Sequence, residues 1–116
     1  MKNDLITRYR NAAITHGEGT RSGDSVKTNR AYDELGVSLK KITETGNDEL
    51  LFSLYDDDIW VQIWAAAHTL EVNEEKALTK LQVIMDAAIP LASTGARYTI
   101  QEWKRGKLTF RVGVLK

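Results

Sequence analysis

The chain of 116 residues is long enough for one domain with one hydrophobic core, and its 42% hydrophobic and 28% charged residues are typical of globular proteins. It contains no cysteine, which excludes disulfide bonds, thiolate zinc sites and cysteine nucleophiles and favours a cytoplasmic location. No run of about eighteen apolar residues is present, and the first residues lack the apolar core of a secretory signal. Neither membrane insertion nor export is therefore expected.

The net charge is zero, but the charges are unevenly distributed along the chain. Residues 1–46 sum to +2, residues 47–94 to −7, with 9 acidic and 2 basic side chains, and residues 95–116 to +5. A neutral total argues against general binding to nucleic acid, which requires a basic surface. The acidic middle segment predicts attraction for a basic partner.

Two helices are predicted in the first part of the chain. Apolar residues recur every three to four positions over 4–16, which predicts an amphipathic helix. The glycines and small polar residues of 16–25 predict a loop. Asp24 or Ser25 then caps a second amphipathic helix, which ends at Gly46.

The middle of the chain predicts a helical hairpin. Asn47 or Asp48 opens a short helix, and the three aspartates of 56–58 form a turn. The helix over 59–70 is apolar on nearly every side, which is typical of a buried helix. We therefore expect this helix at the centre of the fold.

The last third of the chain predicts two further helices. Asn73 caps the first, which ends before the single proline of the chain. Residues 92–96 have the composition of a loop, and Thr99 caps a short last helix that ends at Gly106. Residues 108–116 alternate in hydrophobicity and predict either a strand or an extended arm.

The segment Leu50–Leu70, LLFSLYDDDIWVQIWAAAHTL, resembles the helix–turn–helix unit of a HEAT repeat. HEAT repeats commonly carry an arginine after the aliphatic residue of the second helix, whereas Gln62 follows Val61 here. This departure removes the arginine–aspartate ladder between repeats. The resemblance implies an all-α fold of about six helices in a HEAT- or armadillo-like superhelical arrangement, formed as a single domain by residues 1–116.

Four segments, which together span most of the chain, are similar to a family of small bacterial helical domains with no assigned function. They are TNRAYDEL (28–35), LLFSLYDDDIWVQIWAAAHTL (50–70), NEEKALTKL (73–81) and YTIQEWKRGKLTF (98–110). Such domains resemble immunity proteins of bacterial polymorphic toxin systems, including contact-dependent growth inhibition. The resemblance implies an antitoxin that binds a cognate toxin C-terminal domain, a basic nuclease, and blocks its active site.

The acidic middle segment and its tryptophan supply the candidate toxin-binding residues. Negative side chains near the start of a helix also stabilise it, because they interact favourably with the positive end of the helix dipole. Each of these carboxylates can therefore have a structural role in place of a binding role. For Asp58 we favour a helix cap over a metal ligand, because the glycine and distal glutamate of a calcium loop are absent. The candidates for toxin binding are Asp56, Asp57, Trp60, Glu71, Glu74 and Glu75.

No catalytic constellation is recognisable. His16, at the end of the first predicted helix, and His68, in the apolar helix, are far apart and fit no HExxH or similar motif. Neither an enzyme nor a cofactor or metal is therefore expected. The alternative to an immunity protein is a non-enzymatic HEAT-like adaptor or scaffold that binds a host protein or peptide. The late basic residues are typical of a solvated helix end and do not predict direct nucleic-acid binding: Lys104, Arg105, Lys107 and Arg111.

Overall fold

The computed structural model describes residues 2–106, with side chains from residue 4 onward, and these residues form six helices and no strand. Helices hold 82% of them, which confirms the predicted all-α class and number of helices. The chain divides into two compact units, residues 1–50 and residues 51–116. The expectations of one domain and of a HEAT-like superhelix stay predictions.

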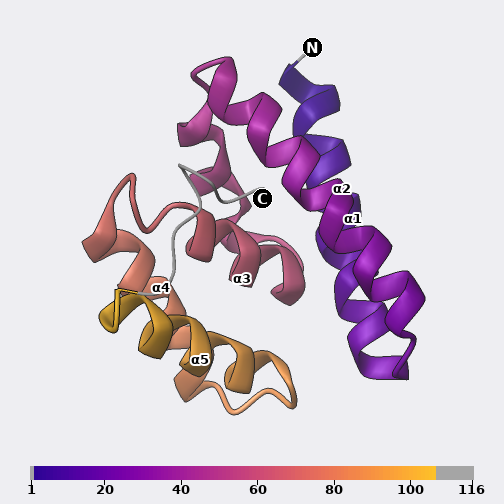
Figure 1. The fold of residues 1–116 in the computed structure, drawn as a ribbon. Helices are drawn as coiled ribbons and strands as arrows, with labels where there is room; N and C mark the ends of the chain where they lie inside the picture. The colour runs from indigo at the N-terminus through magenta and orange to yellow at the C-terminus, as the bar shows by residue number, and fades with distance from the viewer. Residues whose placement is uncertain (1, 107–116) are drawn as a thin grey trace. The chain divides into compact units, whose positions relative to one another are not determined.

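The first unit is a pair of antiparallel helices, α1 (Lys2–Ser22) and α2 (Ser25–Glu44), which lie side by side (Figure 1). Each helix buries one apolar stripe, as the three-to-four-residue spacing predicts. Several of the buried side chains are small, so the two backbones can approach closely. The buried apolar side chains of the pair are Tyr9, Ala12, Ala13, Ala31, Leu35, Leu39 and Ile42.

The loop predicted over 16–25 is wrong, because α1 continues through most of this segment. Gly19 is buried, and a Cβ atom there would lie 2.3 Å from Oγ1 and 3.0 Å from the backbone N of Thr28 in α2. The missing side chain permits this contact, which offsets the low helix propensity of glycine. The helix ends just before Gly23, at φ +74°, where the Asp24 N–H donates to the Gly19 carbonyl at 2.9 Å.

Both predicted boundaries of α2 are confirmed. Asp24 caps its start, because the Asp24 Oδ1 atom accepts a hydrogen bond from the Lys27 N–H at 3.0 Å. The helix ends near Gly46, at φ +72°, where the Asn47 N–H donates to the Ile42 carbonyl at 3.0 Å. Glycine reaches this left-handed conformation without the steric penalty of a Cβ atom.

The predicted third helix is a 3₁₀-helix, η1 (Asp48–Asp56), which crosses the division between the units. The second unit then holds α3 (Ile59–His68), α4 (Glu74–Asp86) and α5 (Ala92–Lys104). Helix α3 contacts both α4 and α5, which also contact each other (Figure 1). No residue of α3 is exposed, so the helix predicted to be buried is the centre of this unit.

The loop predicted over 92–96 is also wrong, because α5 begins at Ala92. Ala92, Ala96 and Ile100 are buried at a spacing of four residues, which places them on one face of a single helix. Thr99 therefore lies within the helix and does not cap it; its hydroxyl donates to the Gly95 carbonyl at 2.9 Å. Burial of the alanine face outweighs the loop-like composition of this segment.

The connection between α4 and α5 explains why α5 starts without a side-chain cap. Leu91 precedes the helix at φ +65°, and no side-chain hydrogen bond caps the helix there. The Ser93 hydroxyl instead accepts from the Ile89 N–H at 2.7 Å and donates to the Ile84 carbonyl at 2.7 Å. One side chain thus satisfies a donor of the connection and an acceptor at the end of α4.

The chain past α5 turns at Gly106, at φ +73°, as the sequence predicts. The strand or arm predicted over 108–116 lies outside the described residues. Within residues 2–106, no helix is both long and apolar enough to cross a membrane.

Candidate functional site

The first group of candidate residues lies at the amino-terminal end of α3. Asp58 caps the helix as predicted: its Oδ1 atom accepts from the Trp60 N–H at 2.9 Å. Asp57 organises the turn, because its Oδ1 atom accepts from the Asp58 N–H at 2.6 Å and its carbonyl accepts from Gln62 Nε2 at 2.6 Å. The exposed Asp56 side chain stands beside this ordered turn. Asp56 and Asp57 are therefore presented on a fixed backbone.

Trp60 lies in the first turn of α3 and is half-buried. One turn later, Trp64 is also half-buried and its ring lies 5.4 Å from that of His68. His68 is buried within this apolar helix. A half-buried tryptophan offers apolar contact area of the kind that is enriched at protein-binding hot spots.

The second group lies past the carboxyl end of α3, where Glu71, Glu74 and Glu75 are all exposed. Glu74 and Glu75 occupy the first turn of α4, where the positive end of the helix dipole stabilises negative charge. Asn73 caps this helix as predicted, because its Oδ1 atom accepts from the Lys76 N–H at 3.1 Å. The local structural interpretation therefore holds for Glu74 and Glu75, whose side chains are nevertheless exposed.

Glu74 also has a partner that sequence spacing could not reveal. The indole Nε1 of Trp103, in α5, donates a hydrogen bond of 2.7 Å to Glu74 Oε2. The two residues are 29 positions apart, so only the packing of α5 against α4 brings them together. One oxygen of Glu74 is fixed by this bond, and its other oxygen remains available to a partner.

The structure does not gather the six candidates into one cluster. Helix α3, with 10 residues, separates Asp56 and Asp57 from the glutamates. A rise of roughly 1.5 Å per residue sets the two groups about 15 Å apart along the helix. A single partner reaches both groups only if its surface spans the length of α3.

A lysine lies beside the second group. The Lys76 ammonium sits 4.3 Å from the centre of the Phe52 ring, a cation–π geometry. Phe52 packs edge-on against Tyr55 at 5.5 Å, and the Tyr55 hydroxyl hydrogen-bonds to Thr69 Oγ1 at 2.6 Å. Lys76 thus offsets part of the negative charge at the start of α4.

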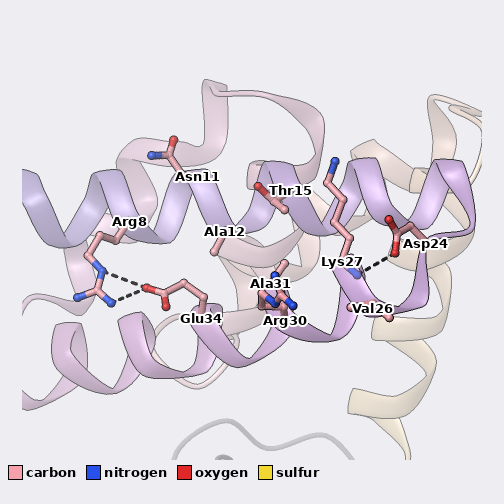
Figure 2. Close-up of a pocket in the computed structure, with 10 residues that line it drawn as sticks. All are labelled: Arg8, Asn11, Ala12, Thr15, Asp24, Val26, Lys27, Arg30, Ala31 and Glu34. Carbon is pink, nitrogen blue, oxygen red and sulfur yellow. Dashed lines mark hydrogen bonds and ion pairs between the residues drawn. The ribbon is translucent and has the colours of Figure 1, made fainter.

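The first unit contains a feature that the sequence did not predict, a groove of about 620 Å³ along α1 and α2 (Figure 2). Its floor includes Ala12 and Ala31, and charged side chains from both helices form its walls. At one end Arg8 donates to Glu34 Oε1 from Nε at 3.0 Å and also from its terminal nitrogen. The sequence hardly indicates this groove. Its only sign is the pair of alanines Ala12 and Ala31, and alanines on facing helices are also typical of close helix packing without a groove.

The other sites considered from the sequence do not form catalytic clusters. No group of three histidine, cysteine, aspartate or glutamate side chains able to hold a metal ion occurs among the described residues. His16 lies within α1 and not at its end, which corrects its predicted place. Burial lowers the pKa of its imidazole below 6.5, so the neutral form is favoured there and not the imidazolium expected at a helix end.

The second unit therefore presents two acidic groups, one before and one after α3, and the half-buried Trp60 lies beside the first of them. None of the family models, curated proteins and solved structures compared with the chain matches it.

Proposed function

We propose that this protein is an immunity protein that acts by binding alone. Its partner is the C-terminal domain of a bacterial toxin, a basic nuclease, and the complex covers the active site of that nuclease. The observation that carries the proposal is the pair of exposed acidic groups at the two ends of α3, with Trp60 in the first turn of that helix.

Charge complementarity gives this surface a physical role. A nuclease cleft carries cations that bind phosphates, so carboxylates at the two ends of α3 can take the place of the nucleic acid. The segment 47–94 carries 9 acidic and 2 basic side chains, which favours fast, salt-sensitive association with such a cleft. Trp60 adds apolar contact area next to Asp56 and Asp57.

The proposal is tested with the protein encoded immediately upstream of this gene, since immunity genes follow their toxin genes. Purified upstream C-terminal domain is mixed with the full chain, and the association rate is measured between low and high salt. We expect a stable complex, loss of nuclease activity, and an association rate that falls with salt.

Two variants test the acidic surface without disturbing its internal bonds. Asp56→Asn and Glu75→Gln remove exposed charges from the two groups, and we expect the double variant to associate about tenfold more slowly with a flatter salt dependence. Asp86→Asn, at the far end of α4, removes one charge outside both groups and serves as the control for each single variant. Unchanged binding in the double variant would exclude the acidic-surface mechanism, and absence of any complex would favour the adaptor function.

A further inference from the structure

The groove in the first unit is a candidate for a second binding surface. Its ligand would be acidic, whereas the acidic groups at the ends of α3 favour a basic partner. We propose that the groove along α1 and α2 docks a short acidic peptide segment of a partner protein, with Arg30 receiving a carboxylate. This inference goes beyond the proposed function, because it concerns another unit of the chain and a ligand of opposite charge.

The shape of the groove comes from small side chains on two facing helices. Ala12 of α1 and Ala31 of α2 are both buried and leave space between the rims (Figure 2). The volume of about 620 Å³ lies within the range of roughly 300–1,000 Å³ that is typical of ligand sites. The groove follows the helix pair lengthwise, which suits an extended or helical peptide better than a compact ion.

The acidic side chains around the groove have partners within the protein, whereas one of the basic side chains has no ion pair with any residue that the structure describes. Glu34 accepts two hydrogen bonds from Arg8, and Asp24 accepts the Lys27 N–H at the start of α2. Both acidic side chains of the lining are thus held by partners within the protein. By contrast, Arg30 is exposed, and no ion pair joins it to another residue of the described part of the chain.

Lys27 provides a second cation that can turn toward a ligand. Its ammonium pairs with Glu18 at 3.5 Å, which is longer than the roughly 2.7–2.9 Å of a strong charge-assisted bond. Both side chains of this pair are substantially exposed, so water competes with the contact. The Arg30 guanidinium is therefore available to a ligand, and the Lys27 ammonium is available in part. These two cations give the groove a preference for a carboxylate.

The remaining lining favours a peptide over nucleic acid. Val26 is 64% exposed at the edge of the groove, and Asn11 and Thr15 add polar groups that suit a peptide backbone. Nucleic acid requires several uncommitted cations along its backbone, whereas Arg8 and Lys27 of the lining already pair with carboxylates. A segment that places a carboxylate near Arg30 and an apolar side chain on Val26 fits both features.

The test uses the full chain, labelled with ¹⁵N, and the probe peptide acetyl-Leu-Glu-Ala-Glu-Leu-amide. We expect concentration-dependent shifts of backbone amides in the groove, and none with the matched peptide acetyl-Leu-Gln-Ala-Gln-Leu-amide. Arg30→Gln should weaken binding of the acidic peptide by about threefold, the effect of losing one exposed ion pair. Arg21→Gln, an exposed arginine of α1 outside the lining, makes the same change of charge and should leave binding unchanged.

Several results would overturn the proposal. Equal shifts with the glutamine peptide, no shifts with either peptide, or binding that Arg30→Gln leaves unchanged would each exclude carboxylate docking at Arg30. Equal Arg30-dependent shifts with inorganic phosphate at matched ionic strength would show a free-anion site, and tighter binding of a thymidine hexanucleotide would show a nucleic-acid site. Circular dichroism checks that Arg30→Gln folds; if it does not, Lys27→Gln replaces it, with a smaller expected loss because Lys27 also pairs with Glu18.

Discussion

The indole Nε1 of Trp103 donates a hydrogen bond of 2.7 Å to Glu74 Oε2 and so joins the last turn of α5 to the first turn of α4. The bond fixes the glutamate that begins the second acidic group. It also places an aromatic ring beside a carboxylate that sequence analysis treated as free for a partner. The stability of the second unit and the presentation of Glu74 are thereby linked.

Removing the indole donor tests this link. Trp103→Phe keeps the apolar ring but loses the N–H, and we expect the free energy of unfolding to fall by about 0.5–1 kcal/mol in urea titrations, because the bond is partly exposed. Glu74→Ala should cost more than Glu75→Ala, since both lose a carboxylate in the same helical turn but only Glu74 accepts a bond from Trp103. Equal stability of the two alanine variants would show that the bond contributes nothing.

The two glycines Gly19 and Gly95 predict opposite effects of the same substitution. A Cβ atom at Gly19 would lie 3.0 Å from the backbone N of Thr28, so Gly19→Ala forces the helices apart and should destabilise the protein by about 1–3 kcal/mol. Gly95 lies in α5 with nothing within 4 Å of such an atom, so Gly95→Ala should stabilise by up to about 1 kcal/mol. Thermal unfolding measures both, and a stabilising Gly19→Ala would contradict the close contact.

The buried pair Tyr55 and Thr69 predicts an asymmetry between its two partners. The Thr69 hydroxyl lies 2.8 Å from the Ala65 carbonyl, to which it donates, so Tyr55 donates to Thr69 at 2.6 Å. Tyr55→Phe removes the donor and should cost about 1 kcal/mol, whereas Thr69→Val leaves the buried tyrosine hydroxyl unpaired and should cost about 2 kcal/mol. Urea titrations of the two variants and their double variant check the order, and a larger loss for Tyr55→Phe than for Thr69→Val would contradict it.

His16 predicts a pH dependence of stability. Burial lowers the pKa of the folded-state imidazole below 6.5, so below about pH 6.5 the unfolded chain binds more protons than the folded one. The free energy of unfolding should therefore fall as the pH drops from about 7.5 to 5.5. In the His16→Gln variant the free energy of unfolding should fall less over this pH range than in the unaltered protein. Equal falls in the two proteins, measured by urea titration at each pH, would contradict this role of His16.

The sequence predicts those features that depend on neighbouring residues. Asp24, Asp58 and Asn73 cap the helices that begin beside them, because a cap needs only a short polar side chain before a helical segment. The burial of α3 likewise follows from its own composition.

The features that sequence reasoning missed depend on distant residues. Glycine both disfavours a helix and permits a close contact, and the contact of Gly19 with Thr28 decides between these effects. The alanines at the start of α5 are helical because they pack against the rest of the second unit. The bond between Trp103 and Glu74 and the groove at Arg30 similarly require the packed helices, which no local pattern contains.

The glycine contact near the α1–α2 turn has a consequence for how the chain reaches its fold. Gly19 and Thr28 are only nine positions apart, so the contact closes a short loop at little entropic cost. The rest of the helix pair can then form from this point, because α1 and α2 both lie within the first 44 residues. During synthesis this hairpin can form while the acidic second unit is still being translated, so the groove is built before the surface proposed to bind the toxin.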